Sequence, residues 1–429
     1  MADNHKISVR NMKKCLTLLF AASSMLLFNA CENEVFTPER VENTKDLVAP
    51  ADFDWKTTQS QTYNLISKVN TVVSIYTDKD CTDESLLIEN LVLNANEATD
   101  VSVNIPTYVT SIFVQYPTED GKEVFEINTN GVTTRVWPEE GSFIQLPAEK
   151  DVVHEGFLGD LREHYYYPKK RGQGTLMFED LYPSKGDYDF NDYVIGYNVE
   201  IFKSPFIGID WRKAAVGFIM KFQIRAIGGS LPFRPAIRLK GFAMENLKWA
   251  NIEYESSTDG ITIELLEEGR SGKDDVIFFI NGTESLCNGG YYNTVTGQIN
   301  KNMPVVTCRV TRNGLGEENY YIAKQYEKLA KNLPDYFDFF IQNKETGDEI
   351  HFRGFSPTGI KGNNQSTDTE YKSKENLVWA IAVPQKISHP AEKEDIIKVY
   401  PEFNKWVTSG GKDCKYWYRN PQGSCINLN

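Results

Sequence analysis

Short runs in which apolar and polar residues alternate recur along most of the chain, with polar turns between them. The clearest run lies at residues 214–227, where Phe218, Met220, Phe222, Ile224 and Ala226 share one face of an extended segment. Lys221, Gln223 and Arg225 lie on the opposite face. A period of two with one apolar face predicts a half-buried antiparallel strand. Similar runs predict strands at 71–76, 86–88, 101–105, 111–116, 175–178, 193–201, 236–239 and 276–280.

Helical periodicity is scarce, so the fold class expected is mainly β, with two β-sandwich-like domains. One or two short helices are expected towards the C-terminus, at Ile322–Leu333 before Pro334 and at Glu392–Trp406 with a break at Pro401. The strand spacing predicts a small N-terminal β-sandwich at residues 51–147 and a second β domain at residues 152–429. The proline- and glycine-containing stretch Trp137–Asp151 is the expected linker.

The first thirty residues have the pattern of a secretory signal peptide. Two lysines precede a mostly apolar run, Leu16–Phe28, which is too short to span a membrane as a helix. The run ends in Leu27-Phe28-Asn29-Ala30-Cys31, which resembles a bacterial lipobox. We therefore expect a signal at residues 1–30, lipidation at Cys31 and a flexible lipid-anchored tether at residues 31–50. The alternative is a secreted protein whose Cys31 is unmodified.

The acidic residues that follow Cys31 resemble the export signal of surface lipoproteins. Glu32-Asn33-Glu34 therefore predicts a surface-exposed protein of the outer membrane. The formal net charge of the whole chain is −13, and the first thirty residues hold four of its basic residues but one acidic residue. So acidic a mature chain repels nucleic acid, which is excluded as a partner.

Cysteine usage is compatible with an oxidising compartment. Besides Cys31, the mature chain has five cysteines, so at most two disulfides form and one thiol stays free. The pairs closest in sequence, Cys414 with Cys425 and Cys287 with Cys308, are the expected bridges. Five reduced and buried thiols are the alternative, and the absence of CxxC gives no support to a zinc or thioredoxin-like site.

The densest group of polar side chains is Asp187-Tyr188-Asp189-Phe190-Asn191-Asp192. In an extended segment Asp187, Asp189 and Asn191 would share one face. Carboxylate and amide oxygens are the ligands that Ca²⁺ prefers, and Glu179 and Asp180 on the preceding strand could add to them. The motif is not an EF-hand, because Asp192 stands where that loop needs glycine and Asn198 where it needs glutamate. The alternative to a calcium site is a set of hydrogen bonds from turn amides, with Tyr188 and Phe190 anchoring the loop in the core.

Enzyme motifs are absent from the sequence. There is no HExxH, GxSxG or phosphate-binding glycine loop, and the histidines have no metal or nucleophile spacing. We therefore expect a non-catalytic protein. Tyr165, Tyr166 and Tyr167, followed by Lys169-Lys170-Arg171, could contact a sugar ring or an anionic partner. A tyrosine-rich strand followed by a solvated basic turn is the alternative.

Several motifs together resemble the LruC-domain lipoproteins, whose C-terminal part is the DUF4842 family. These are Gly174–Pro183 followed by Gly186–Asp192, Arg225–Gly228, Tyr371–Ala380, and Tyr400–Val407 with Ser409–Gly411 and Trp417-Tyr418; Asp52–Thr58 resembles the entry to the family's N-terminal module. The resemblance implies a mainly β, membrane-anchored envelope protein, and it implies no reaction. The expected role is therefore binding, adhesion or assembly with other envelope proteins, with calcium as the candidate cofactor. A glycan-binding or carbohydrate-active surface lipoprotein is the alternative.

Overall fold

The computed structural model describes residues 41–129, 143–152, 162–204, 215–266, 275–313, 316–360 and 370–428. Residues Glu42–Asn429 form one compact unit. The signal peptide predicted for residues 1–30, the lipidation site Cys31 and the first part of the expected linker, residues 137–142, lie outside the described residues. Among the described residues, no helix is both long enough and apolar enough to cross a membrane.

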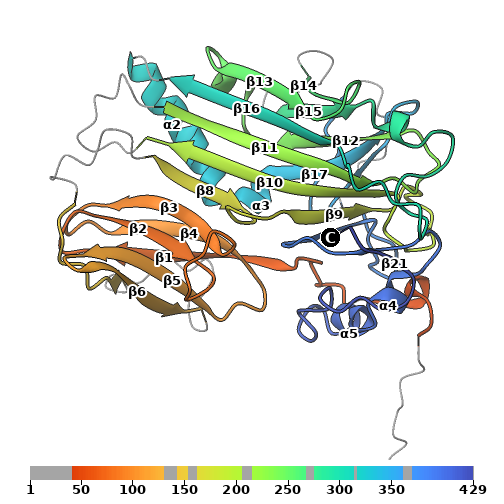
Figure 1. Cartoon of the computed structure of the whole chain (residues 1–429), viewed down its shortest axis with the longest axis horizontal. Helices are drawn as coiled ribbons and strands as arrows, with labels where there is room; N and C mark the ends of the chain where they lie inside the picture. The colour runs from red at the N-terminus through yellow and green to blue at the C-terminus, as the bar shows by residue number, and fades with distance from the viewer. Residues whose placement is uncertain are drawn as a thin grey trace, which may run out of the picture. The chain divides into compact units, whose positions relative to one another are not determined.

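The N-terminal part is a sandwich of two small sheets, drawn in orange tones in Figure 1. The two layers have the strand orders β4-β1-β7 and β3-β2-β5-β6. Their facing side chains, among them Leu65, Ile75 and Val114, are fully buried. The strands are β1 (Thr58–Ile66), β2 (Thr71–Tyr76), β3 (Leu86–Leu93), β4 (Thr99–Pro106), β5 (Ser111–Thr118), β6 (Gly121–Asn128) and β7 (Ile144–Gln145).

The larger part is a second sandwich. One layer has the order β13-β16-β11-β10-β8, with β9 paired to β10 and β19 paired to β9, and the facing layer has the order β14-β15-β12-β17-β18. Ring contacts of Phe218 with Phe278 and of Phe222 with Phe339 join the two layers across the core. The strands are β8 (Glu163–Tyr167), β9 (Gly174–Phe178), β10 (Tyr193–Lys203), β11 (Ala215–Ala226), β12 (Phe233–Leu239), β13 (Asn251–Ser256), β14 (Thr262–Leu265), β15 (Val276–Asn281), β16 (Val305–Asn313), β17 (Phe337–Asn343), β18 (Glu349–His351) and β19 (Ala380–Val383).

The two sandwiches share one hydrogen-bonded sheet. Strand β3 of the first pairs antiparallel with β8 of the second, with Ile88 opposite Tyr165 and Glu89 opposite His164. Strand β7 pairs with β1, so the end of the expected linker belongs to the first sandwich. The mainly β expectation with two sandwich-like parts is confirmed, and the two parts are continuous rather than separated by a linker.

Strand β11 follows the predicted alternation with one exception. Phe218, Met220 and Phe222 are buried and Lys221 is exposed, as the period of two requires. Arg225 was expected on the solvent face but is fully buried. Its guanidinium donates to Thr175 Oγ1 at 2.7 Å and to Gln173 Oε1 at 2.9 Å, and it lies against Gly196, where a side chain would collide with it.

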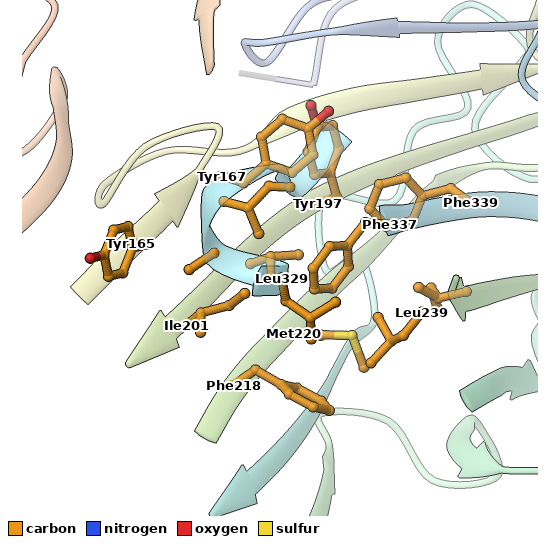
Figure 2. Packing of buried hydrophobic residues seen from close by; sticks show 14 of the residues in the cluster. Tyr165, Tyr167, Tyr197, Ile201, Phe218, Met220, Leu239, Leu329, Phe337 and Phe339 are labelled. Atoms are coloured by element: carbon orange, nitrogen blue, oxygen red, sulfur yellow. The ribbon is translucent and has the colours of Figure 1, made fainter. Parts of the chain in front are cut away.

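Four α-helices occur in the described residues, and the longest lies between the two sandwiches. Tyr326 of α2 contacts Phe218 and Phe242 of the second sandwich, and Leu329 packs into the same core, as Figure 2 shows. The helix begins earlier than the sequence predicted, and Pro334 lies in α3 directly after it. The helices are α2 (Gly316–Lys331), α3 (Leu333–Tyr336), α4 (Ile396–Val399) and α5 (Glu402–Thr408), and the shorter elements are η1 (Thr44–Asp46), η3 (Met244–Leu247), η4 (Thr283–Leu286), β20 (His389–Pro390) and β21 (Cys425–Ile426).

Part of the predicted tether is folded. Residues 42–57, here named the N-terminal strap, bury Leu47 and Ala49 to 1% exposure each. The backbone amide of Ala49 donates to Glu375 O at 3.0 Å, and the indole nitrogen of Trp55 donates to Asn376 O at 2.9 Å. The boundary predicted at residue 50 is therefore wrong, because apolar side chains and backbone pairing attach the chain to the second sandwich from residue 44 onward.

The five cysteines of the described residues have free thiols. The predicted bridges Cys287–Cys308 and Cys414–Cys425 are both absent. Cys308 points into the core from the middle of β16, and burial raises the pKa of its thiol to about 12. Cys287 is only partly buried and lies at the end of the short helix η4. The two cysteines are close in sequence, but their thiols are not bonded to each other.

Candidate metal centre

The acidic motif lies in the loop between β9 and β10, residues 179–192, here named the acidic loop. Tyr188 and Phe190 are buried and adopt left-handed backbone conformations, with φ of 56° and 53°. Non-glycine residues rarely adopt this conformation, so the surrounding contacts hold the loop in place. The two-face arrangement expected of an extended segment is therefore wrong, because the chain coils and turns Asp189 and Asn191 inward together with the aromatic rings.

Backbone amides donate to most of the acidic side chains. Glu179 accepts from Phe190 N at 2.6 Å and from Tyr188 N at 3.2 Å. Asp189 accepts from Asn191 N at 3.0 Å and from Lys393 N at 2.8 Å. Asp192 accepts from Asp180 N at 2.7 Å. The hydrogen-bonded network that the sequence offered as the alternative to calcium is thus present.

This network leaves the negative charge uncompensated. None of the ion pairs formed among the described residues includes Glu179, Asp180, Asp187, Asp189 or Asp192. Burial, followed by repulsion from Asp187, raises the pKa of Asp189 to about 8. Burial, followed by repulsion from Asp180 and Asp189, raises the pKa of Asp192 to about 9. Burial, followed by repulsion from Asp192 and Asp189, raises the pKa of Glu179 well above its ordinary value.

Another buried charged cluster in the same domain shows a different solution. Asp338 pairs with Arg238 at 2.6 Å and with His351 Nδ1 at 2.9 Å, and Glu349 contacts His351 Nε2 at 3.1 Å. Burial disfavours the charged imidazole, but the two carboxylates outweigh burial and raise the pKa of His351. In this cluster Arg238 and His351 balance the charges of Asp338 and Glu349. None of the described residues forms such an ion pair with the carboxylates of the acidic loop.

Three acidic side chains converge closely enough to share an ion. One oxygen from each of Glu179, Asp187 and Asp189 lies within 4.8 Å of the others. Two oxygens bound to one Ca²⁺ at about 2.3–2.6 Å can be up to about 5 Å apart, so this spacing fits. Glu179 and Asp189 are buried whereas Asp187 is exposed, which leaves one side of the group open to solvent.

Two further side-chain oxygens, one in the acidic loop and one packed near it, accept no hydrogen bond. Asn191 Oδ1 is buried and accepts no hydrogen bond, although its Nδ2 donates to Pro390 O at 3.2 Å. Oε2 of Glu392 is likewise without a hydrogen bond, although Thr294 lies near the carboxylate. Both oxygens face Gly228: a Cβ there would overlap Asn191 Oδ1 and lie 3.0 Å from Glu392 Oε2.

The structure thus divides the six residues predicted as metal ligands. Glu179, Asp187 and Asp189 form the convergent group, Asp180 and Asp192 contact each other beside it, and Asn191 faces Glu392. Glu392 was not predicted from the sequence. It is 200 positions further along the chain, and only the packing of residues 389–396 against the loop brings it there.

The tyrosines predicted as ligand contacts are buried. Tyr165, Tyr166 and Tyr167 have exposures of 5%, 8% and 7%. Tyr165 donates to Glu163 at 2.9 Å and Tyr166 to Glu89 at 2.7 Å. They are strand residues of the shared sheet, so the prediction of an open stacking surface is wrong.

Family comparisons agree with this architecture. Residues 214–418 match a family described as "Domain of unknown function (DUF4842)". Residues 214–418 are a DUF4842 domain. Residues 71–137, whose described part 71–129 belongs to the first sandwich, match a second family, "Domain of unknown function (DUF4841)". The predicted DUF4842 membership is confirmed. The acidic loop lies ahead of the matched range, separated from it by β10, while Gly228 and Glu392 lie within it.

One solved structure shares the fold. It is a candidate lipoprotein from Bacteroides ovatus, with a TM-score of 0.63 and 20% sequence identity, and the match covers 84% of this chain and 100% of that protein. No curated protein matches the chain. This likeness concerns the fold alone, and the LruC part of the resemblance stays a prediction.

Proposed function

We propose that this DUF4842 protein is a lipid-anchored protein of the cell envelope with a non-catalytic binding or structural role, stabilised by Ca²⁺ in the acidic loop. The observation that carries the calcium proposal is the convergence of Glu179, Asp187 and Asp189, none of which forms an ion pair with another described residue. The unpaired oxygens of Asn191 and Glu392 support it, because a buried acceptor without a donor is costly unless something positive lies against it.

A bound Ca²⁺ would act mainly on the C-terminal segment. Lys393 N donates to Asp189, and Ile396 N donates to Tyr188 O at 2.9 Å, so residues 393–396 already pack on the loop. Neutralising the loop would remove the repulsion that opposes this packing. In this proposal calcium fixes α4 and α5 against the second sandwich.

Thermal unfolding of residues 32–429 with excess Ca²⁺ and with a chelator tests the calcium proposal. The variant of choice is Asp187→Asn, because Asp187 makes no hydrogen bond within the described residues and its loss removes a ligand charge alone. Asp259→Asn, at an exposed turn, is the matched control. We expect Ca²⁺ to raise the melting temperature of the wild type and the control, and to raise that of Asp187→Asn much less. Identical wild-type curves with Ca²⁺ and with chelator would remove calcium from the proposal.

The membrane anchor rests on the signal-like residues 1–30, on Cys31 and on the likeness to a candidate lipoprotein. We place the protein in the outer membrane, exposed at the cell surface, on the acidic residues after Cys31. Fractionation of cells that express the wild type or Cys31→Ser tests this. Wild type in the membrane fraction and Cys31→Ser in the soluble fraction would support the anchor, and protease added to intact cells would report surface exposure.

A further inference from the structure

Three buried side-chain oxygens near the acidic loop have no hydrogen-bond partner within the described part of the chain. They are Asn191 Oδ1, Thr294 Oγ1 and Glu392 Oε2. Their residues come from the acidic loop, from the segment between η4 and β16, and from the residues that follow β20. A buried oxygen without a donor costs free energy unless a positive group lies against it.

Packing brings these three oxygens to one place. A Cβ at Gly228 would overlap Asn191 Oδ1 and lie 3.0 Å from Glu392 Oε2, so these two oxygens are neighbours. Two oxygens bound to one Ca²⁺ can be up to about 5 Å apart, so their spacing fits a shared ion. Glu392 N donates to Thr294 O at 2.9 Å, which holds Thr294 beside Glu392. Asn191 Nδ2 donates to Pro390 O at 3.2 Å, so Oδ1 of the same amide points away from Pro390.

Glu392 lies outside the convergent group of carboxylates. That group consists of Glu179, Asp187 and Asp189, whose oxygens lie within 4.8 Å of one another. Glu392 is nevertheless close to it, because burial, followed by repulsion from Asp187, raises the pKa of Glu392. One ion in the convergent group therefore does not account for the unpaired oxygens around Gly228.

The negative charge at the site exceeds what one divalent ion can offset. Six carboxylates lie here, and none of them forms an ion pair with another described residue: Glu179, Asp180, Asp187, Asp189, Asp192 and Glu392. Lys393 follows Glu392 in the chain but is exposed. One Ca²⁺ would leave four of these charges without compensation. Two would leave two, and the contact between Asp180 and Asp192 can hold a shared proton.

We propose that the acidic loop binds two Ca²⁺ ions. The first is the ion of the convergent group, and the second lies beside Gly228, bound by Asn191 Oδ1, Thr294 Oγ1 and Glu392 Oε2. Amide, hydroxyl and carboxylate oxygens are all ligands that Ca²⁺ accepts, and water completes its coordination. This inference rests on the proposed calcium function and adds a second ion, which joins the acidic loop to two segments far away in the sequence.

The number of bound ions tests the inference on residues 32–429. Equilibrium dialysis with radioactive Ca²⁺ counts the ions per chain, and calorimetry measures the affinity of each. We expect two ions for the wild type. Glu392→Gln keeps the size of the side chain but removes its charge. It should weaken the second ion at least about tenfold, the loss that follows even when a residue next to a metal ligand is replaced, and leave the first ion bound. Glu394→Gln, at a partly exposed carboxyl two positions along, is the matched control and should still bind two ions.

Thr294→Val distinguishes a metal ligand from a hydroxyl that is merely buried. The Thr294 hydroxyl makes no hydrogen bond with the described residues, so in chelator the variant should be about as stable as the wild type. In saturating Ca²⁺ the variant should bind the second ion more weakly and gain less in melting temperature than the wild type.

The outcomes separate this inference from the calcium proposal on which it rests. One ion per wild-type chain would overturn the second site and leave the calcium proposal in place. A wild type that binds no ion would overturn both. Two ions bound with unchanged affinity by Glu392→Gln and by Thr294→Val would show that the second ion is not beside Gly228, and would overturn the site.

Discussion

The carboxylate of Asp395 joins the first described residues of the chain to its last helices. Asp395 Oδ2 accepts from the backbone amide of Thr44 at 2.7 Å, across 351 positions of sequence, and the Thr44 hydroxyl donates to Oδ1. The same Oδ1 accepts from Ile397 N at 3.0 Å and so caps the N-terminus of α4. One buried side chain therefore fixes both the N-terminal strap and the segment that packs on the acidic loop.

Asp395→Ala should lower the free energy of unfolding by about 2–3 kcal/mol, because it removes a helix cap and leaves the Thr44 amide without its partner. Urea unfolding of residues 32–429 measures the change, with Asp259→Ala as the exposed control. A loss under about 0.5 kcal/mol, the size of an ordinary surface substitution, would mean that the strap is not attached through Asp395.

Gly228→Ala should be destabilising by about 1–3 kcal/mol, because the added methyl group displaces the oxygens of Asn191 and Glu392. Calcium affinity measured by calorimetry should fall in the same variant. Gly290→Ala is the matched control, since the nearest atom to its added Cβ is Cys287 O at 3.8 Å. Equal behaviour of the two variants would show that the space over Gly228 is not restricted.

The stability of the calcium-free protein should fall as pH rises from about 4, the ordinary pKa of an aspartate, to about 8. Over this window the folded state keeps the proton on Asp189, whose pKa is about 8, while the unfolded chain has lost it. The folded state then binds more protons, so raising the pH favours unfolding. Asp189→Asn should show a flatter profile in chelator, measured as melting temperature against pH. The raised pKa of His351 makes stability fall with rising pH in the wild type and in Asp189→Asn alike, so it adds no difference between their profiles. Profiles of equal slope for the two proteins would contradict the prediction.

Excess Ca²⁺ should act most strongly at the alkaline end of that window. A metal ion binds ionised carboxylates and must displace the protons that the loop retains at low pH. The calcium-induced rise in melting temperature should therefore be larger at pH 8 than at pH 5. A rise that is equal at the two pH values would place the ion away from the protonated carboxylates.

Five thiols per chain of residues 32–429 should react with an alkylating reagent after unfolding without reductant, counted by mass spectrometry. In the folded protein Cys308 should be protected, because it is fully buried in the core. A count of three or one in the unfolded chain would show that one or two disulfides form after all.

Local periodicity was enough to predict the fold class and nine of the strands, but it missed others, among them β1, β16 and β17. The alternation from Phe218 to Ala226 depends only on neighbouring residues and on one buried face, and β11 follows it. Arg225 departs from the pattern because β9 and the residues before it provide Thr175 and Gln173 as hydrogen-bond partners. No local pattern could predict that a second layer of polar groups would cover that face.

The candidate metal centre was predictable only in part. The spacing of Asp187 and Asp189 identified the loop, but the left-handed backbone of Tyr188 and Phe190, which turns the side chains inward, depends on how the rings pack. Glu392 comes from a distant loop with no motif of its own, and the motif Arg225–Gly228 gave no sign that Gly228 lies against the acidic loop. The same limit explains the strap, since the partner of the Ala49 amide, Glu375 O, lies 326 positions later in the chain.

The way the strap is attached decides which part of the molecule would bear a mechanical load. A pull on the chain ahead of Glu42 reaches Thr44, Ala49 and Trp55 first, and their partners Asp395, Glu375 and Asn376 all lie within residues 214–418. The tension would therefore pass into the DUF4842 domain, while the N-terminal sandwich would stay out of the line of force until the strap peeled away. In a tethered protein the first sandwich would thus remain unstretched.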